Sequence, residues 1–484
     1  MSPDRLLLVV NPRSADSLTL ANHYAFGRNV PPDNIMALSW DDAKTTADWS
    51  EFYDKIFKPV QTEAKQRKCL AVAFSSGFPI SVDISKTFTV DEKDMPENVK
   101  KVMVSSGSLT GMMYLGPLLE QVGSAPWNLS VLMRNYYIYL HGIPLLPTLD
   151  EERLWKTEPF SESLLSKHLP CVCLGVKTPA YTTDQAVENL KRSIEADGTF
   201  PQGTVYFMVN SDIRSKTRQA EFDRAVESLA RIALQKKYEN LQGKKESGGL
   251  PQGKTDIIGL VAGSAVLDWP KSNSRFVPGA FGEHLTSYGG SLFNTCGQTP
   301  LTAFLLAGAA GSSGTVTEPY AIAAKFPSCS LQVHYISGLT QIEAYYHAIR
   351  WPYQLLYVGD PLCRPWFPKQ EIVSRSYRIG NPPPIQILSP EEKNADLSEK
   401  TRAIQFGQTL ELKIGPLPKE TGAIRVLHGS RAILEQPVNS DFATLSISTR
   451  QLGCGPILLR IVGLDSTGNM VFQNALELSL ISIK

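Results

Sequence analysis

The sequence predicts an α/β protein with a mostly parallel sheet, followed by an all-β domain. In the first two thirds, continuous apolar runs such as Cys69–Phe74 alternate with amphipathic helical segments, the pattern of parallel strands buried on both faces. Beyond a stiff proline-rich linker at Gly380–Pro384, apolar and polar residues alternate as in half-buried strands. We therefore expect an α/β region over residues 1–379, which could divide into subdomains of residues 1–200 and 201–379, and an immunoglobulin-like β-sandwich over residues 380–484.

Strands and helices are expected to follow one another along the α/β region. Asp16–Tyr24 is expected to be the first helix, because Ser17 can cap it and its apolar residues recur at helical spacing. Arg218–Lys237 is the longest amphipathic helix, and Gly243–Lys254 is expected to be a surface loop. The other expected helices are Glu51–Arg67, Gln298–Gly308 and Leu339–Ala348, and the expected strands are Arg5–Val10, Ile35–Leu38, Cys69–Phe74, Tyr136–Leu140, Pro170–Leu174, Thr204–Val209, Asp256–Ala262, Ser291–Thr295, Thr315–Thr317 and Leu355–Val358. In the C-terminal domain the expected strands are Thr409–Ile414, Ala443–Ile447, Ile457–Val462 and Leu476–Ile483.

Composition and charge argue against several classes of partner. The 48 basic and 47 acidic residues leave a formal charge of +1, so neither nucleic acid nor a membrane surface is indicated. No apolar run approaches the roughly 18 residues that span a bilayer. The seven cysteines are scattered, and the single C-x-C pair, Cys171 and Cys173, has no second pair to complete a zinc site. We expect no metal or other cofactor, and interpret these cysteines as small buried residues.

The N-terminal segment does not decide the compartment. The run Leu6–Val10 is too short for the core of a signal peptide and favours a buried strand. Export or a place at the cell envelope is expected if a signal has been removed, and the cytoplasm otherwise.

Small residues cluster between Phe276 and Trp366 as nowhere else in the chain. The block Ala307–Gly314 follows an apolar helical run and precedes the strand-like Thr315–Thr317. Glycine and alanine at this density permit close approach of backbones. The composition is that of the edge of a site or of a tight junction between sheet and helix, so we expect function to lie in this region.

The order of elements in this region resembles that of a known family. One strand ends at Gly263, and a later strand-like run is followed by Cys296. A helix then ends in Gly-Ala, and the last strand is followed by Gly359–Pro361. This order, closed by an immunoglobulin-like domain, resembles the gingipain family of caspase-fold cysteine peptidases. The resemblance implies a three-layer α/β domain, with a mostly parallel sheet and helices on both faces, and a peptidase-like hydrolase.

A closer resemblance covers most of residues 5–368. An uncharacterised bacterial family shares the runs Leu285–Gly290, Glu318–Pro319, Lys325–Pro327 and Gly359–Leu362. The chain therefore resembles a bacterial family whose own resemblance to the gingipains is distant.

One departure from the gingipain pattern affects the expected chemistry. The family places a His-Gly pair after the strand that precedes the cysteine strand, and here that position reads Ala262-Gly263-Ser264. A cysteine nucleophile needs a neighbouring base or a lowered pKa. Cys296 precedes the expected helix Gln298–Gly308, whose dipole would stabilise a thiolate, and His284 could supply the base. The alternative is a small buried cysteine in a degenerate fold without catalysis.

Other residues compete with this pair. On a helix, His284 and Ser287 would share a face, although Ser287 lacks the G-x-S-x-G turn that exposes a nucleophile. Glu318, just after a strand, could hold Lys325, Arg364 or a substrate amine, or could form a structural salt bridge. Walker A, H-E-x-x-H and G-x-G-x-x-G motifs are absent from the sequence.

Two functions remain open at this point. The first is a peptidase-like hydrolase with its site at the carboxyl edge of the sheet around residues 263–318, with Cys296, His284, Ser287 and Glu318 as candidate catalytic residues. The second is a catalytically inactive binding or scaffolding protein. Either would take a protein or peptide as its ligand, and the oligomeric state is left open.

Overall fold

The computed structural model describes residues 1–86, 104–119, 168–369, 375–389 and 402–482. The chain forms two compact units. The first contains residues 1–6, 43–74 and 78–369, and the second contains residues 7–42, 75–77 and 370–484. The strand expected at Tyr136–Leu140 lies outside the described residues.

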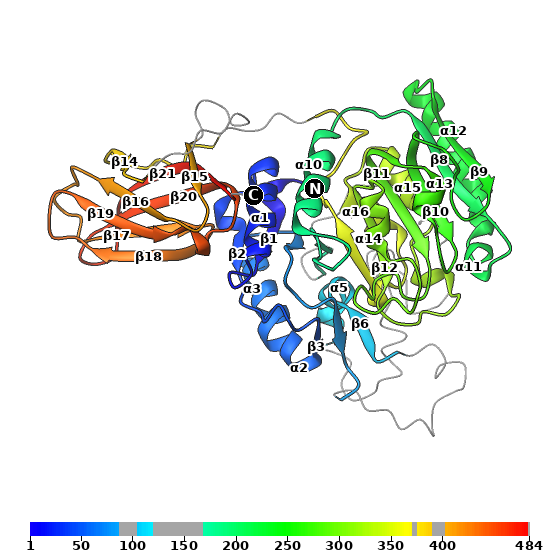
Figure 1. Ribbon diagram of the computed structural model, residues 1–484, viewed down its shortest axis with the longest axis horizontal. Coiled ribbons are helices and arrows are strands. Elements are labelled where there is room, and N and C mark those ends of the chain that lie inside the picture. Colours follow the sequence, from blue (N-terminus) through cyan, green and yellow to red (C-terminus); the bar gives the residue numbers. More distant parts are fainter. Residues whose placement is uncertain (87–103, 120–167, 370–374, 390–401, 483–484) are drawn as a thin grey trace. The chain divides into compact units, whose positions relative to one another are not determined.

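A large, mostly parallel sheet organises the first unit, as the sequence predicts (Figure 1). Its strands in this unit run in the order β4-β7-β13-β12-β11-β10-β8-β9. Neighbours are parallel except for β12 and β13, which are antiparallel. The bounds are β4 (Ala71–Phe74), β7 (Cys171–Cys173), β8 (Gly203–Val209), β9 (Leu241–Ser247), β10 (Ile257–Gly263), β11 (Phe276–Leu285), β12 (Gly311–Thr315) and β13 (Leu355–Gly359). A small separate sheet contains β3 (Thr46–Asp48), β5 (Ser81–Asp83) and β6 (Ser106–Ser108).

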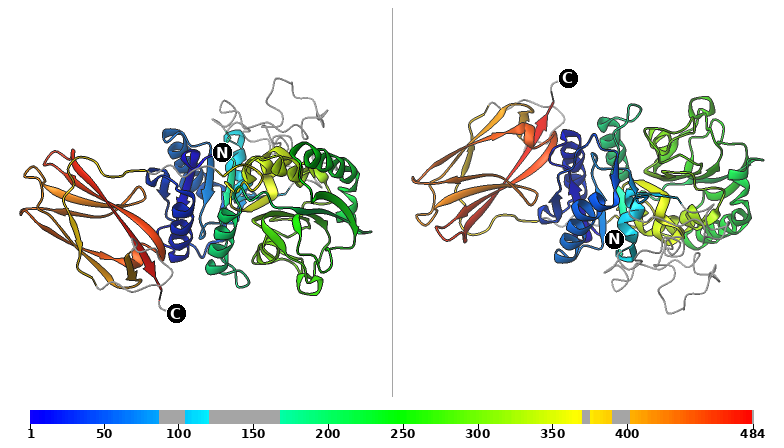
Figure 2. Two further views of the ribbon diagram at one scale, coloured as in Figure 1. Left: turned by 90° about the horizontal axis from the view of Figure 1, so that it is seen from above. Right: turned by 90° about the horizontal axis from the view of Figure 1, so that it is seen from below.

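Helices pack on both faces of the large sheet (Figure 2). On one face, Phe207 of β8 packs on Phe222 of α12, and Phe281 of β11 packs on Tyr345 of α16. On the other face, Phe304 of α14 packs on Phe276 of β11. The helices among the described residues of this unit are α2 (Trp49–Phe52), which continues through Tyr53–Phe57 into α3 (Lys58–Gln66), α5 (Leu109–Leu119), α10 (Thr183–Glu195), α11 (Ile213–Lys216), α12 (Phe222–Lys236), α13 (Trp269–Ser272), α14 (Leu301–Leu306), α15 (Ser330–Ile336) and α16 (Gln341–Ala348). None of the helices that the structure describes is long and apolar enough to cross a membrane.

The second unit contains the antiparallel strands predicted for the C-terminal region. One sheet has the order β14-β16-β19 and the other β15-β21-β20-β17-β18. Apolar residues from both, such as Leu412 and Leu445 from the first and Val426 and Ile461 from the second, form one buried core. The parallel pair β1 (Leu6–Val10) and β2 (Ile35–Ala37), with helix α1 (Ala15–Arg28) between them in the chain, completes the unit. The bounds are β14 (Ile385–Ile387), β15 (Arg402–Gln405), β16 (Thr409–Ile414), β17 (Ala423–His428), β18 (Arg431–Pro437), β19 (Ala443–Ser448), β20 (Gly455–Leu464) and β21 (Met470–Ile481).

The structure corrects the expected elements around the candidate site. The strand expected at Ser291–Thr295 is absent, and these residues form turns and irregular chain. The strand of this region is instead β11, and Val277–Ala280 bulges out of its pairing with β10. The expected helix Gln298–Gly308 is reduced to α14, because Pro300 is its N-cap and the chain leaves the helix at Ala307.

Glycines bring two backbone segments into direct contact beside β12. A Cβ atom on Gly314 would lie 2.4 Å from the carbonyl carbon of Gly289, and one on Gly290 would lie 2.1 Å from the carbonyl oxygen of Gly314. Both distances are shorter than side chains tolerate, so this junction requires glycine for space. The small-residue block therefore includes a tight contact between the loop after β11 and β12.

We predict that Gly314→Ala will destabilise the first unit by about 3 kcal/mol, the upper range for overpacking a site that cannot relax. The control is Gly289→Ala, whose Cβ would meet a side-chain methyl of Thr286 at 3.2 Å. That methyl can move, so the control is expected to cost less than about 1 kcal/mol. Denaturant unfolding followed by tryptophan fluorescence measures both, and equal losses would contradict the packing argument.

Candidate functional site

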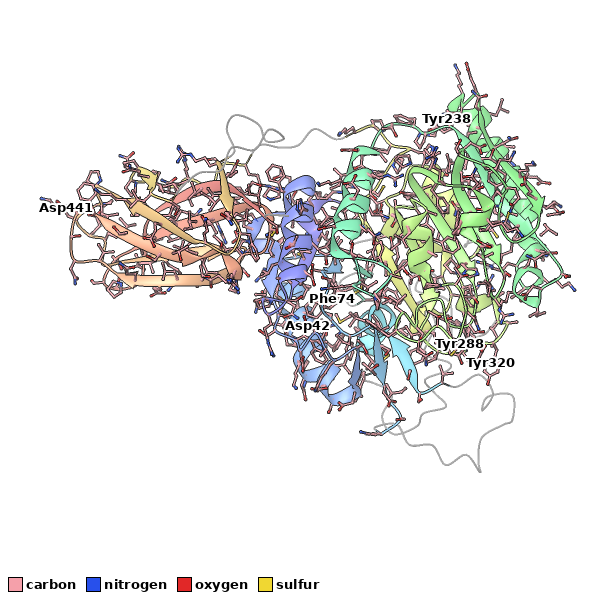
Figure 3. The ribbon with its side chains drawn as sticks, in the orientation of Figure 1. Asp42, Phe74, Tyr238, Tyr288, Tyr320 and Asp441 are labelled. Atoms are coloured by element: carbon pink, nitrogen blue, oxygen red, sulfur yellow. The ribbon has the colours of Figure 1, made fainter. Side chains whose placement is uncertain are left out.

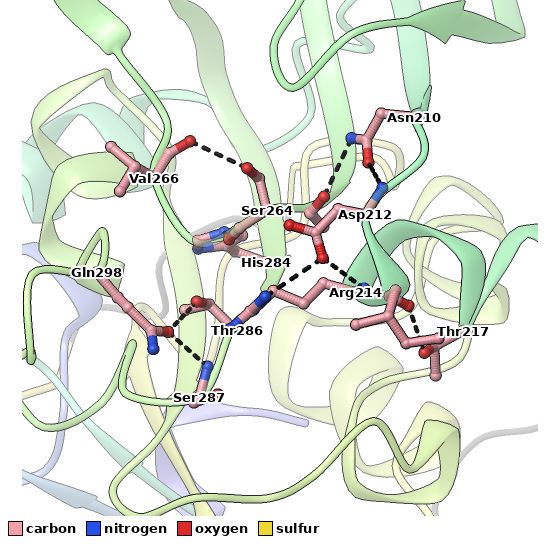
Figure 4. Close-up of polar contacts among 12 residues, drawn as sticks. Asn210, Asp212, Arg214, Thr217, Ser264, Val266, His284, Thr286, Ser287 and Gln298 are labelled. Atoms are coloured by element: carbon pink, nitrogen blue, oxygen red, sulfur yellow. Dashed lines mark hydrogen bonds and ion pairs between the residues drawn. The ribbon is translucent and has the colours of Figure 1, made fainter.

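The carboxyl ends of four strands meet at one edge of the sheet in the first unit. β8, β10, β11 and β12 are parallel to one another, so the segments that follow them converge there (Figure 4). In open α/β sheets, ligands bind beyond the carboxyl ends of strands. We call these four segments, residues 210–218, 264–268, 286–300 and 316–325, the strand-end site.

Asn210 joins three strand ends at one side of this site. Its Nδ2 donates to the carbonyl oxygens of Gly248 and Gly263, at 3.1 Å each, and its Oδ1 accepts from the backbone N–H of Asp212 at 2.9 Å. Asp212 in turn accepts from the backbone N–H of Arg214 at 2.9 Å and so caps α11. The backbone here is held by side chains, which gives the site a fixed border.

The end of β11 is held in a similar way. Oε1 of Gln298 accepts hydrogen bonds from the Thr286 hydroxyl and from the backbone N–H of Ser287, the latter at 2.8 Å (Figure 4). From the other side, Oγ1 of Thr315 lies 2.9 Å from both the Thr286 and the Ser287 carbonyl oxygens. Ser287, a candidate from the sequence, is therefore buried with its backbone fixed on both sides.

His284 lies on a strand and not on a helix, so it does not share a helical face with Ser287. The imidazole is 1% exposed and stacks on Phe304, with its Nε2 2.8 Å from the carbonyl oxygen of Ser264. The pKa of His284 is lowered to about 3, mainly by burial and to a smaller extent by the nearby cations Arg218 and Arg214. The ring is therefore neutral near pH 7. Nε2 donates to Ser264, and Nδ1 has no hydrogen-bond partner among the described residues.

Cys296 is exposed in the loop after β11, and it does not follow a strand directly as the sequence suggested. Its Sγ lies 3.7 Å from Oδ1 of Asn294. Helix α14 begins only at Leu301 and is 6 residues long, so the helix dipole invoked for a thiolate is not available. No imidazole of the described residues is hydrogen-bonded to this thiol.

The structure does bring Cys296 and Glu318 together, around Tyr288. Burial raises the pKa of Tyr288, and the nearby Glu318 carboxylate, Cys296 and Tyr320 raise it further. Tyr288 and Tyr320 lie beside each other at this edge in Figure 3. Oε1 of Glu318 accepts from the backbone N–H of Tyr320 at 2.8 Å. These four residues come from the loops after β11 and β12.

Lys325 and Arg364 were the two cations expected as partners of Glu318. Of these two, only Lys325 lies close enough to interact with the Glu318 carboxylate. Lys325 is 4% exposed, and burial lowers its pKa to about 8 against the opposing effect of Glu318. Arg364 lies elsewhere, where its backbone N–H donates to Asp197 at 2.8 Å and its guanidinium stacks on Phe367.

Sequence reasoning missed a buried ion pair under the strand-end site. The guanidinium of Arg218 pairs with the carboxylate of Glu283, and both side chains are 2% exposed. Arg218 also donates to the carbonyl oxygen of Ala262 at 2.7 Å. The pair thus ties the segment after β8 to β10 and β11. The sequence offered little signal for this pair, because Glu283 is flanked by Gly282 and His284 and no strand was expected there.

Large exposed apolar side chains surround the strand-end site. Each lies on a segment that follows a different strand of β8, β10, β11 and β12. They are Ile213, Val266, Phe293 and Tyr320, which are 58%, 62%, 51% and 48% exposed. We call these four side chains the apolar rim. Within the described part of the chain, no group of three or more His, Cys, Asp or Glu residues is placed to hold a metal ion.

Comparisons with known proteins found matches among the solved structures. No family model and no curated protein matches the chain. A crystal structure of gingipain R (RgpB), an Arg-specific cysteine proteinase, matches at 10% identity over 99% of this chain and 98% of that chain, with a TM-score of 0.38. The complex of the Porphyromonas gingivalis RgpB pro- and mature domains matches at 10% identity over 99% and 100%, with a TM-score of 0.34. Fibronectin(III)-like modules of Clostridium thermocellum CbhA match at 13% identity over 21% of this chain and 97% of that chain, with a TM-score of 0.16.

We predict that the His284 imidazole stays neutral in the folded protein from pH 7.5 down to pH 5. Its Cε1–H resonance, assigned by its loss in His284→Gln, will not shift over this range in an NMR titration. In urea the same resonance should titrate near the unperturbed value of about 6.5. A folded-state midpoint near 6.5 would show a solvated ring and would contradict the burial argument.

The same burial has a consequence for stability. Because the unfolded state binds the His284 proton more tightly, folding stability is lost as the pH falls from about 6.5 toward 3. His284→Gln should therefore flatten the pH dependence of unfolding in this window.

Proposed function

We propose that this protein binds a segment of another protein at the strand-end site and does not hydrolyse it. One observation carries the proposal: His284 is buried, neutral and bonded through Nε2 to Ser264, and no imidazole of the described residues is hydrogen-bonded to the exposed Cys296. A thiol that no neighbouring base deprotonates is a poor nucleophile.

The apolar rim supports binding. Exposed apolar side chains that gather around one area mark interaction sites more often than single ones do. Here the four side chains of the apolar rim lie on four different loops. Hydrogen bonds from Asn210 and Gln298 hold the backbone of these strand ends in place. A peptide segment with large apolar side chains fits this arrangement, because the rim can bury those side chains while Glu318 and the two tyrosines offer polar contacts at the same edge.

The second candidate is a cysteine hydrolase of peptidase type, with Cys296 as nucleophile. It is favoured by the exposure of Cys296 beside Tyr288 and Glu318, and by Lys325, whose pKa of about 8 would let a lysine take up a proton near neutral pH. In this alternative, Ser287 and Glu318 would position the substrate.

We also propose the finer architecture. Helices on both faces of the mostly parallel sheet support a three-layer fold of caspase and gingipain type for residues 1–379. The two sheets around one core support an immunoglobulin-like sandwich for residues 380–484.

Labelling of the intact protein with iodoacetamide at pH 7, read by peptide mass spectrometry, separates the two candidates. We predict that Cys296 reacts at a rate within about threefold of N-acetylcysteine, because no imidazole of the part of the chain that the structure describes is bonded to it. The same reaction in urea gives the rate of the unfolded chain. Reaction more than tenfold faster in the folded protein would overturn the inactive assignment and favour the hydrolase.

Selection of a phage-displayed random 12-residue peptide library on the full chain tests binding itself. We predict enrichment of peptides with large apolar residues, and a loss of about tenfold in affinity with Phe293→Ser, because truncating an aromatic anchor costs more than about 1 kcal/mol. Phe442→Ser is the matched control, since Phe442 is 49% exposed but lies in the second unit. No enrichment, equal effects of the two variants, or cleavage of the bound peptides would contradict the proposal.

A further inference from the structure

Two side chains present hydrogen-bond donors at the strand-end site. They are Arg214, from the first turn of α11, and Gln298, from the loop that follows β11. Figure 4 shows both side chains extending toward Thr286, at the end of β11. Each is oriented by contacts with the protein, and each keeps donors that the described residues do not use.

The backbone of Arg214 is fixed on the end of β10. A Cβ atom on Gly263 would lie 2.4 Å from the carbonyl carbon of Arg214, so glycine is needed for α11 to approach this strand so closely. The hydroxyl of Ser215, the next residue, donates to the carbonyl oxygen of Met208 at 2.8 Å. Contacts with two strands, β8 and β10, therefore set the position from which the Arg214 side chain extends.

Asp212 orients the guanidinium of Arg214 and leaves one of its edges unused. Oδ1 of Asp212 accepts from Nη1 of Arg214 at 3.3 Å and from its backbone N–H at 2.9 Å. Nε is buried, and it has no hydrogen-bond partner among the described residues. The edge formed by Nε and Nη2 matches the two oxygens of a carboxylate. The side chain is 24% exposed, so a ligand can reach the guanidinium from solvent.

The bonds of Gln298 decide which end of its amide is left for a ligand. Oε1 accepts from the hydroxyl of Thr286 and from the backbone N–H of Ser287, the latter at 2.8 Å. Because a backbone N–H can only donate, the amide cannot be turned round, and its NH2 group faces away from these partners. That NH2 group forms no hydrogen bond within the part of the chain that the structure describes. Gln298 is half-buried, so this donor is also within reach of a ligand.

The other charged groups of the strand-end site favour a ligand with a single negative charge. Arg218 and Lys325 already interact with carboxylates of the protein, and Asp268 caps α13. Asp212 offsets part of the charge of Arg214 from the Nη1 side. A phosphate, with a charge of about −2, would therefore meet too little positive charge, whereas a carboxylate carries only one negative charge.

We infer that the protein segment bound at the strand-end site presents a carboxylate, which accepts hydrogen bonds from Arg214 and from the amide of Gln298. The inference rests on the proposed function and adds the chemical class of the ligand. Both side chains offer donors, and a carboxylate has two acceptor oxygens and no donor. Two sources share this chemistry, the side chain of an aspartate or glutamate and the C-terminal carboxylate of the partner.

The test measures retention of the fluorescently labelled full chain on beads that carry random nonapeptides. The peptides are attached through their N-termini, and their variable positions are drawn from Phe, Leu, Ile, Tyr, Ser and Gly. Four mixtures differ in the central residue and the C-terminus: Gln with an amide, Glu with an amide, Gln with a free carboxylate, and phosphoserine with an amide. We expect one or both carboxylate mixtures to retain about tenfold more protein than the neutral mixture, as charge-assisted hydrogen bonds imply.

Two variants test the donors one at a time. Arg214→Gln and Gln298→Glu should each reduce the tenfold ratio to less than about twofold. Gln298→Glu keeps the oxygen that bonds to Thr286 and Ser287 and replaces the NH2 group by a charged oxygen. Lys216→Gln is the matched control, because Lys216 is an exposed cation of the same helix, and its loss should leave the ratio unchanged.

The four mixtures separate the possible results. Preference for Glu assigns the carboxylate to a side chain, and preference for the free carboxylate assigns it to the end of the partner chain. Retention of the neutral mixture with no preference for a carboxylate, or a preference that persists in both variants, would overturn the inference and leave the proposed binding intact. Stronger retention by phosphoserine than by either carboxylate would also overturn it. No retention by any mixture would contradict the proposed function itself, and the inference with it.

Discussion

The reversal of strand direction between β12 and β13 decides where a site can form in the first unit. Because these two strands are antiparallel, the carboxyl ends of β8, β10, β11 and β12 gather at one edge. The carboxyl ends of β4, β7 and β13 point to the opposite edge. Gly359–Pro361, at the end of β13, is thereby separated from Cys296 and Glu318, although the sequence placed all of them in one functional stretch.

The strand at this reversal, β12, carries only glycine, serine and threonine. Its small residues allow the Gly289–Gly290 loop and the Gln341 side chain to approach the backbone closely. Beneath the same edge, the pair Arg218–Glu283 holds the segment after β8 to the strands beside it. Removing one partner of such a buried pair typically costs about 3–5 kcal/mol, since the other charge is left in a medium that cannot solvate it. The close backbone packing at the glycines and the buried ion pair thus fix the shape of this edge of the sheet.

Sequence patterns predicted the class of the fold better than its details at the site. Fully buried strands such as β8 and β10 are continuous apolar runs and were expected within one or two residues. β11 was missed because Pro278 and Gly279 indicate a turn, whereas in the structure they bulge out of an otherwise continuous strand. β9, expected as a loop, carries the charged run Lys244–Glu246 that an edge strand tolerates. The approach of Glu318 to Tyr288 and the pairing of Arg218 with Glu283 depend on tertiary structure, which no local pattern contains.

Several hydrogen-bond donors at the strand-end site are already used by the protein itself. Peptide hydrolysis needs a base for the nucleophile and N–H donors for the developing oxyanion. Here the Nε2–H of His284 is bonded to Ser264, and the Ser287 N–H just after β11 is bonded to Gln298. Asn210, whose amide could serve as a donor, is bonded to two carbonyl oxygens. Use of the Ser287 N–H or of the Asn210 amide as an oxyanion donor would require these bonds to break, whereas the proposed binding role uses them as they are, because they fix the loops that carry the apolar rim.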